Sequence, residues 1–201
     1  MPIIKPSNSN SKRQVIVQKA AALFKEKGYK AANMRELAAK VGVEAASLYN
    51  HISGKDDLLS EICFNVCDKY YAHIDELEKL KESWSSKIER LIRFHAREMM
   101  ENYDFVFVTD QNWRQLKEPG LSRCRELRRN YRKRFTAIVQ QGMDAHEISR
   151  MDANSVVMII LNAISAIDQW HRIIHKVDSN ELEKIMIAVL IKGIKLPAGK
   201  E

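Results

Sequence analysis

Apolar residues recur at helical spacing along almost the whole chain, and this periodicity restricts the fold more than any other feature of the sequence. In the first such segment, Ile16, Ala20, Leu23 and Phe24 fall on one helix face. Comparable apolar faces recur in segments that begin near Leu59, Trp84, Cys124, Val156 and Leu182. The stretch DFVFV at 104–108 has the composition of a strand, but its helical surroundings predict a helix there too. The chain is therefore predicted to be all-α.

The amino-acid composition is typical of a water-soluble protein. Of its 201 residues, 45% are hydrophobic and 29% are charged, which suffices to bury a core. Cys63, Cys67 and Cys124 form an odd set without ribbon spacing, so we expect reduced thiols. The first ten residues lack the apolar part of a secretory signal, and the most apolar run, 153–167, is too short to span a membrane. We expect a cytoplasmic protein with no membrane partner.

Two short helical patterns lie close together between residues 33 and 51. Asn33 with Glu36, and Ser53 with Asp56, are spaced as caps that open the second and fourth helices. The second helix is predicted to end at Val41, where Gly42 permits a sharp turn, and the third to cover 45–51. Such short helices are stable only when packed, and the residues expected to form their core are Leu37, Ala38, Val41, Val43 and Leu48. This pattern is typical of a helix-turn-helix, whose second helix fits a DNA major groove, although spacing alone leaves open a three-helix unit without a ligand.

Positive charge is concentrated in the same region. The whole chain has a net charge of +7, and residues 1–54 contain nine basic residues against three acidic ones, a net charge of +6. Neutralisation of DNA phosphates requires such a concentration of cations. Lys12 and Arg13 are expected on a loose N-terminal arm, where they either enter a minor groove or stay solvated. The charge favours double-stranded DNA as the partner.

The block AANMRELAAKVGVEAASLYNHISGKDDLL resembles the DNA-binding signature of the tetracycline-repressor (TetR) family of bacterial transcription regulators. The shared features are a cap residue, R-E-[IL]-A, a Gly-Val turn, [ST]-L-Y, and a Lys at the head of the following helix. The resemblance implies a homodimer with an N-terminal three-helix helix-turn-helix domain and a C-terminal helical bundle for regulation and dimerisation. We accordingly expect a flexible arm at 1–10, a DNA-binding domain at 11–55, and a ligand-binding and dimerisation domain at 56–201, whose helix 56–81 is the connector.

The resemblance also assigns DNA contacts. Asn33 and Arg35 match positions that touch the DNA backbone or groove edge, and Ser47 and Tyr49 lie on the reading helix. Tyr49 matches a tyrosine that bonds a phosphate, and Lys55 matches a lysine that binds a phosphate at a helix N-terminus. Another position that the resemblance places near the DNA is His51, where many relatives have an aromatic residue or His. A core contact for Tyr49 and a solvated charge for Lys55 are the alternatives.

The start of the reading helix departs from the family pattern. Relatives commonly have Ser or Thr and then Lys or Arg at the positions of Glu44 and Ala45. Glu44 suits the positive end of the helix dipole and is a candidate acceptor for a cytosine amino group. Ala45 and Ala46 offer only methyl contacts, and Asn50 is a candidate partner for adenine. The operator sequence therefore does not follow from this helix.

The helix predicted after Asp152 is apolar on more than one face, which leaves apolar surface in water unless it is covered. Pairing it, and the helix after Ser179, with a two-fold copy makes a four-helix interface, as the resemblance also implies. The residues predicted to line this interface are Val156, Ile160, Ile164, Ile167, Trp170, Ile174, Ile185 and Val189. Burial within a single chain is the alternative. A homodimer also allows two reading helices to address half-sites about 34 Å apart, or a multiple of that, on one DNA face.

A small-molecule effector is expected from the resemblance, but the residues do not identify it. The residues predicted to line its pocket are Trp84, Phe94, Met99, Phe105, Trp113, Arg128 and Tyr131, and a plain hydrophobic core is the alternative. The segment 123–134 carries seven basic residues against one Glu. It is a candidate for binding the phosphates of an acyl-coenzyme-A effector or of DNA, and a solvated helix face is the alternative.

Other chemistry has little support in the sequence. Asp168, His171 and His175 share a helix face, but without a further anchored ligand no metal site is predicted. Cys63 and Cys67 lack the flanking cations that favour a reactive thiolate. No phosphate loop or nucleophile motif indicates an enzyme, so we predict no catalytic residue and no cofactor. The sequence favours a ligand-responsive, DNA-binding transcription regulator that acts as a repressor on a pseudo-palindromic operator. An architectural DNA-binding protein without effector is the alternative.

Overall fold

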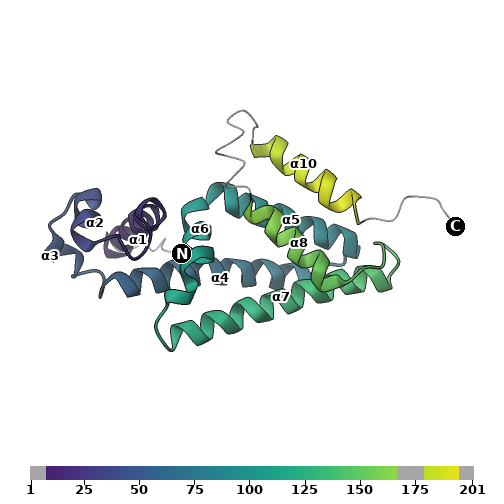
Figure 1. Ribbon diagram of the computed structural model, residues 1–201, viewed down its shortest axis with the longest axis horizontal. Helices are drawn as coiled ribbons and strands as arrows, with labels where there is room; N and C mark the ends of the chain where they lie inside the picture. Colours follow the sequence, from purple (N-terminus) through teal and green to yellow (C-terminus); the bar gives the residue numbers. More distant parts are fainter. Residues whose placement is uncertain (1–7, 167–178, 195–201) are drawn as a thin grey trace, which may run out of the picture. The chain divides into compact units, whose positions relative to one another are not determined.

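The computed structural model describes residues 8–166 and 179–194, and within these ranges the chain forms helices without a β-strand (Figure 1). The helices are α1 (Asn8–Lys27), α2 (Met34–Val41), α3 (Ala45–Leu48), α4 (Lys55–Lys79), α5 (Trp84–Glu101), α6 (Tyr103–Asn112), the 3-10 helix η1 (Trp113–Gln115), α7 (Gly120–Asp144), α8 (Ala153–Ser165) and α10 (Ser179–Lys192). The all-α prediction is confirmed. No helix in the described part of the chain has both the length and the apolar character that a membrane crossing needs.

The chain divides into two compact units. Unit 1 comprises Met1–Asp68 and Asp104–Glu126, and unit 2 comprises Lys69–Tyr103 and Leu127–Glu201. The helices α4 and α7 each begin in unit 1 and end in unit 2. Unit 1 thus includes 104–126, which the sequence assigned to the ligand-binding domain, because segments distant in sequence pack together there. The functional boundary at residue 55 stays a prediction.

The core of unit 1 forms around the apolar face of α1. Ile16, Ala20, Leu23 and Phe24, the face predicted from spacing, are all buried. Leu37, Ala38 and Leu48 from α2 and α3 are buried as well. Val43 does not belong to this core, because its place in the turn leaves it 41% exposed. The helix α1 also begins at Asn8, within the segment predicted as an arm.

Local sequence signals determine the ends of α2. The Asn33 side chain accepts a hydrogen bond from the Glu36 amide at 3.0 Å, the predicted cap. At the other end Gly42 has φ +79°, a left-handed conformation that a residue with Cβ adopts only with strain. These two residues therefore set the short length of α2.

The start of α4 is capped differently from the prediction. The Asp57 carboxylate, not Asp56, faces back toward the start of the helix and accepts from the Ser53 amide at 3.0 Å. Asp56 instead accepts from the Tyr29 hydroxyl at 2.7 Å and pairs with Lys117 at 2.6 Å. The hydrogen bond from Lys117, with that from Tyr29, lowers the pKa of the Asp56 carboxyl. Tertiary contacts within unit 1 thus override the local capping signal.

The segment with strand composition is the helix α6, as predicted from its surroundings. Its first turn carries Asp104, which forms an ion pair with Lys25 of α1. Val106 and Val108 are both buried, although residues two apart point to different sides of an α-helix. Packing of this segment within unit 1 therefore outweighs the local β propensity of DFVFV.

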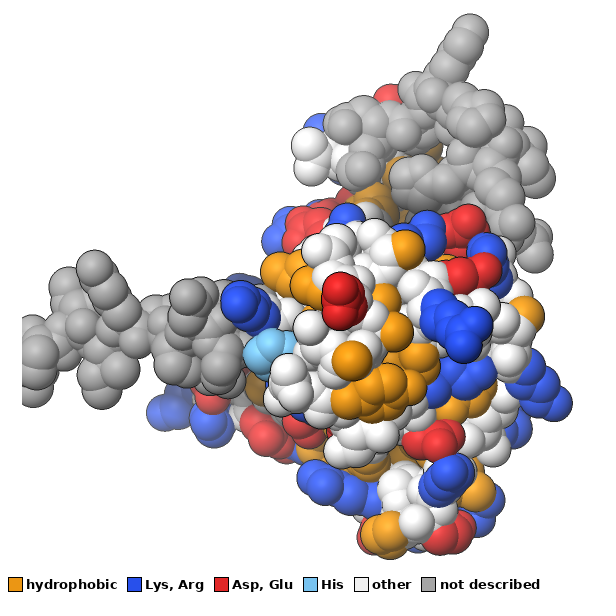
Figure 2. Space-filling model, turned by 90° about the vertical axis from the view of Figure 1, so that its left-hand side faces the viewer, with side chains coloured by type: hydrophobic (Ala, Val, Ile, Leu, Met, Phe, Trp, Pro, Cys, Tyr) orange, Lys and Arg blue, Asp and Glu red, His pale blue; other side chains and the backbone are white. Residues whose placement is uncertain are grey.

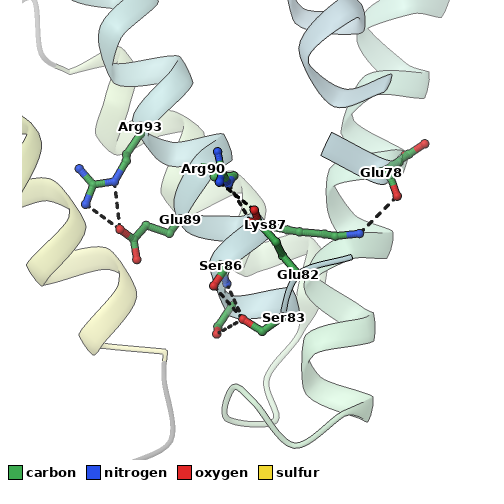
Figure 3. A network of polar contacts seen from close by, with 9 residues as sticks. Glu78, Glu82, Ser83, Ser86, Lys87, Glu89, Arg90 and Arg93 are labelled. Carbon is green, nitrogen blue, oxygen red and sulfur yellow. Dashed lines mark hydrogen bonds and ion pairs between the residues drawn. The ribbon is translucent and has the colours of Figure 1, made fainter. Parts of the chain in front are cut away.

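Unit 2 is organised around α5. This helix buries its apolar face, including Ile88, Leu91 and Ile92, and contacts both α8 and α10. The Ser83 hydroxyl caps α5 by accepting from the Ser86 amide at 3.2 Å (Figure 3). On the solvent side of α5, Arg90 binds Glu82 through two hydrogen bonds of 2.7 and 2.8 Å (Figure 3).

The last described helix is attached to α5 through one buried carboxylate. Glu183 of α10 accepts from Arg93 at 2.5 Å and from Arg97 at 2.9 Å. The hydrogen bond from Arg97, with that from Arg93, lowers the pKa of the Glu183 carboxyl. The predicted cap of α8 is also present, since Asp152 accepts from the Ser155 amide at 2.7 Å.

Candidate functional site

The third helix and the turn that follows it present a polar, exposed surface at one end of unit 1. We call residues 45–51 the reading segment. Its regular α-helical part covers only Ala45–Leu48, and the chain then continues in tight turns, with the His51 amide donating to the Leu48 carbonyl at 2.9 Å. Figure 2 faces the side of Figure 1 on which α2 and α3 lie, and shows Lys and Arg side chains together with acidic, uncharged and hydrophobic ones.

One buried residue anchors the reading segment and its neighbours point outward. Leu48 is fully buried, whereas Tyr49 is 55% exposed. The other residues predicted to meet DNA from this segment are half-buried, as Ala45 and His51 are, or exposed, as Ala46, Ser47 and Asn50 are. Tyr49 is therefore available to a partner, and its predicted alternative as a core residue finds no support in this exposure. The contact with DNA stays a prediction.

The predicted DNA contacts at the N-terminus of α2 and at the N-cap of α3 differ in whether their side chains already have a partner in the described chain. The Asn33 side chain is occupied by its capping bond to Glu36. Arg35 is exposed and has no ion pair among the described residues. Glu44 occupies the N-cap position of α3, but its side chain makes no capping hydrogen bond. All three residues are exposed, but the Asn33 side chain is already used by its capping bond.

Lys55 has a structural role that the sequence did not indicate. Its ammonium donates to the backbone carbonyls of Tyr29, Lys30 and Ala32 at 2.8, 3.1 and 3.0 Å. The ammonium also lies 4.7 Å from the centre of the Tyr29 ring. All three of its donors are used, so Lys55 is not simply a solvated charge. A phosphate contact at Lys55 stays a prediction, and it competes with these carbonyls.

Several cations of unit 1 are neutralised by nearby carboxylates. Lys25 pairs with Asp104, Lys27 with Glu36 at 2.6 Å, and Lys40 with Glu26 at 2.8 Å. The cations of the segment 8–54 that are exposed and unpaired within the described chain are Lys12, Lys19, Lys30 and Arg35. The charge that unit 1 offers to a polyanion is thus smaller than its formal charge.

Arg13 does not lie on a loose arm. It belongs to α1, and its guanidinium is bound to Glu61, Asp57 and the His51 carbonyl. Entry of Arg13 into a minor groove would break all of these contacts. The prediction of a loose arm with a solvated Arg13 is therefore wrong, because tertiary contacts that spacing does not reveal hold the side chain.

The predicted effector residues fall into both units. Phe105 and Trp113 belong to unit 1, and the other members, Trp84, Phe94, Met99, Arg128 and Tyr131, belong to unit 2. In unit 2 the structure brings Phe94 and Tyr131 together around Tyr70, with ring centres 5.6 and 5.5 Å from it. Met99 is buried and Trp84 is half-buried beneath the Lys87 ammonium.

Two histidines extend this aromatic cluster, and the sequence analysis did not include them in the site. His73 stacks on Phe94 with ring centres 3.9 Å apart, and its Nε2 is buried without a hydrogen bond to the described residues. His95 Nε2 shares a 2.8 Å hydrogen bond with the Tyr131 hydroxyl. Burial lowers the pKa of His73 and lowers that of His95 to about 3, so both rings are neutral at pH 7. The helical spacing of His95 with buried residues was the signal for its burial.

The structure corrects the predicted dimer surface. Val156, Ile160 and Ile164 are 5%, 1% and 3% exposed, so these side chains lie in the core of the protomer itself. Ile185 and Val189 are 41% and 66% exposed. The exposed apolar residues of α8 are Met158 and Ile159. They were not predicted, because periodicity does not tell which apolar face of a helix packs against its own chain. Ile167, Trp170 and Ile174 lie outside the described residues.

The basic segment of α7 is divided between paired and exposed side chains. Arg134 binds Asp75 and Glu78 at 2.7 and 2.6 Å, and Arg123 lies over the Phe64 ring. Arg125, Arg129, Arg132 and Lys133 are exposed. No cluster of potential metal ligands occurs in the described ranges, and Asp168, His171 and His175 fall outside them.

Known proteins share this organisation along almost the whole chain. Residues 81–194 match the tetracyclin repressor-like C-terminal domain, and residues 16–62 match the bacterial regulatory proteins of the tetR family. The chain is 23% identical over 194 residues to the HTH-type transcriptional repressor KstR2 of Mycobacterium tuberculosis H37Rv, covering 92% of this chain and 94% of that protein.

Solved structures have the same fold. The structure of the ketosteroid transcriptional regulator KstR2 of Mycobacterium tuberculosis matches with a TM-score of 0.86 at 20% identity, covering 94% of this chain and 97% of that one. AibR in complex with isovaleryl coenzyme A and operator DNA matches with a TM-score of 0.79 at 18% identity, covering 90% and 98%. These likenesses concern the fold of the chain.

Proposed function

Because this chain belongs to the TetR family of bacterial regulatory proteins, we propose that it is a cytoplasmic transcriptional repressor that binds a pseudo-palindromic operator as a homodimer and leaves it when an effector binds. The observation that carries this proposal is the reading segment. A buried anchor, Leu48, holds a short exposed helix whose tip carries Tyr49 at 55% exposure. Such a helix fits a major groove.

Electrostatics supports DNA as the partner. Lys12, Lys19, Lys30 and Arg35 are exposed cations of unit 1 without ion partners in the described chain. Contacts of this kind with phosphates supply affinity that does not depend on sequence, whereas the reading segment supplies the contacts to bases. We infer that the base contacts come from Ser47, Tyr49 and Asn50, which are exposed and uncharged.

A second copy of the chain would cover the exposed apolar residues of unit 2. Ile159 of α8 and Val189 of α10 are 62% and 66% exposed, and Met158 and Ile185 are also among the exposed large hydrophobic residues. Large apolar groups cluster on a surface where another protein binds. Dimerisation through these helices would also provide the two reading segments that a palindromic operator requires.

The effector is proposed to be an acyl-coenzyme A, whose acyl chain is its apolar part, or another apolar small molecule. The aromatic cluster around Tyr70, with Phe94 and Tyr131, provides apolar surface inside unit 2. AibR, a protein of the same fold, was solved with isovaleryl coenzyme A and operator DNA. For release, the effector must bind more tightly to the arrangement that fits DNA poorly.

Selection of duplexes from a random pool, followed by effector screening on the selected fragment, tests this function. We expect a sequence with two-fold symmetry, bound by a dimer and released by at least one acyl-coenzyme A of a chain-length series. If the protein prefers no DNA sequence, the proposed function as a regulator is wrong. Binding to many dispersed sites would favour an architectural role. If no acyl-coenzyme A releases the protein from DNA or stabilises it, the proposed effector class is wrong. The proposed DNA-binding function is not affected by that result.

A further inference from the structure

The guanidinium of Arg13 connects three elements of unit 1. Its Nε donates to Glu61 at 2.8 Å, its Nη2 lies 2.5 Å from the same carboxylate, and Nη2 also reaches Asp57 at 3.2 Å. Its Nη1 donates to the backbone carbonyl of His51. Every nitrogen of the side chain is therefore engaged, on α4 through Glu61 and Asp57 and on the end of the reading segment through His51.

The Asp57 carboxylate continues the connection along the chain. Asp57, which accepts from Arg13, also accepts from the Ser53 amide at 3.0 Å. The link between the reading segment and α4, residues 52–54, is thus bounded by the His51 carbonyl on one side and by Asp57 on the other. The planar guanidinium carries five N–H donors in a rigid fork, so it can bind several groups in set directions at once.

The reading segment needs such support because its own helix has only four residues. A helix this short has almost no stability without tertiary contacts. Leu48 and Ile52 are buried and attach the segment to the core. The apolar contacts of Leu48 and Ile52 determine how deeply the segment is buried, but they are not directional. The hydrogen bond from Arg13 to the His51 carbonyl is directional and therefore also fixes the orientation of the segment. Tyr49 lies between the buried Leu48 and the bound His51.

We propose that Arg13 is a positioning residue for operator recognition, which acts by holding the reading segment at a defined angle to α4 and not by touching DNA. This inference rests on the proposed function. A base-reading helix must be held close to its productive geometry by its supporting side chains. Arg13 supports the end of the reading segment, because it binds the His51 carbonyl before the link 52–54 and the Asp57 carboxylate after it.

The test uses the full-length protein, the operator fragment selected for the wild type, and a mixed-sequence duplex of equal length. Arg13→Gln removes the contacts. Lys12→Gln removes the same charge from an exposed neighbour and shows what loss of a proposed phosphate contact does, namely weaker binding to both duplexes with a reduced salt slope. Glu61→Ala removes a partner of Arg13 while making unit 1 more positive, and Ala favours the helix. Each Kd is measured at several salt concentrations, at a temperature where circular dichroism shows the variant folded.

We expect Arg13→Gln to weaken operator binding about tenfold or more while binding to the mixed duplex changes little. The slope of log K against log salt should stay unchanged, since a lost phosphate contact would reduce it by about 0.9. Glu61→Ala should also weaken operator binding, although charge alone predicts the opposite sign. The double variant should equal Arg13→Gln, because the two side chains act as a unit.

Two results would overturn the proposal. One is a Glu61→Ala protein that binds the operator as tightly as the wild type or more tightly. The other is an Arg13→Gln protein that loses affinity equally for both duplexes with a reduced salt slope, which would make Arg13 a phosphate contact. If Arg13→Gln does not fold, Glu61→Ala decides the question. Absence of sequence preference in the wild type would instead mean that the proposed function has failed.

Discussion

His95 and Tyr131 share a 2.8 Å hydrogen bond inside unit 2, and both side chains are almost completely shielded from solvent. The bond joins α5 to α7. Burial, with a smaller effect of His73, lowers the pKa of His95 to about 3, and burial raises the pKa of Tyr131. Two groups that titrate freely in water are therefore kept neutral in the folded chain.

This burial predicts a loss of stability on mild acidification. The unfolded chain protonates His95 near pH 6.5, whereas the folded chain resists protonation down to about pH 3. The stabilisation is thus complete above pH 6.5 and decreases as the pH falls, by roughly 1 to 1.5 kcal/mol per pH unit. His95→Gln, which does not titrate, should unfold in urea with a weaker dependence on pH between 7 and 5 than the wild type. An unchanged dependence would contradict a neutral buried His95.

Tyr49 should matter for DNA and little for folding. Because its side chain is 55% exposed, Tyr49→Ala should change the free energy of unfolding by no more than about 0.5 kcal/mol. We expect the variant to lose operator affinity by roughly tenfold in fluorescence anisotropy. Tyr49→Phe separates the hydroxyl from the ring, and Met151→Ala, which alters a residue of unit 2 that is 43% exposed, is the control. Equal affinity of Tyr49→Ala and wild type would remove Tyr49 from the interface.

Lys55 should contribute to the stability of unit 1 whether or not it meets DNA. Lys55→Met keeps the aliphatic stem but leaves the Tyr29, Lys30 and Ala32 carbonyls without this donor, and it should cost about 1–3 kcal/mol in urea unfolding. Lys30→Gln, at an exposed position, is the control and should cost little. The salt slope of DNA binding then reads out the second role, since loss of a phosphate contact would reduce it by about 0.9.

Neighbouring residues of α8 should respond in opposite ways to substitution. Ile159 is 62% exposed and Ile160 is 1% exposed. Ile159→Asp should give a folded monomer in sedimentation equilibrium, because it places a charge in the proposed interface. Ile160→Ala should instead remain dimeric and lose about 2–5 kcal/mol of stability through a core cavity. A dimeric Ile159→Asp protein would exclude this face as the interface.

The attachment of α10 should depend on one carboxylate. Glu183→Gln weakens the bonds from Arg93 and Arg97, and we expect a loss of about 1–3 kcal/mol with faster hydrogen exchange in 179–192. Glu181→Gln removes the same charge from an exposed position of this helix and should have little effect. Similar exchange in the two variants would show that apolar packing alone holds α10.

Features that depend on nearby residues could be predicted from the sequence. Asn33 caps α2, Asp152 caps α8, and Gly42 takes the left-handed conformation that ends α2. Each of these depends on a few neighbouring residues, which the sequence displays directly. The same is true of the apolar face of α1.

Features that depend on tertiary partners could not be predicted in this way. The exposed Tyr49 follows a recognisable motif, but no pattern reveals that Arg13 binds Asp57 and Glu61 or that Lys55 binds three carbonyls. Periodicity finds the apolar positions of α8 without separating the inward Ile160 from the outward Ile159. Charge counting likewise overestimates the cations of unit 1, since their pairing with distant carboxylates is invisible in composition.

The internal pairing of Lys25, Lys27 and Lys40 has a consequence for how DNA binding responds to a rise in ionic strength. Affinity that depends on many exposed ammonium groups falls steeply as the salt concentration rises. A surface whose ammonium groups are already occupied by its own carboxylates has less attraction to lose, so shape and base contacts determine more of its occupancy. Control by this protein should therefore persist through such changes better than its isoelectric point implies.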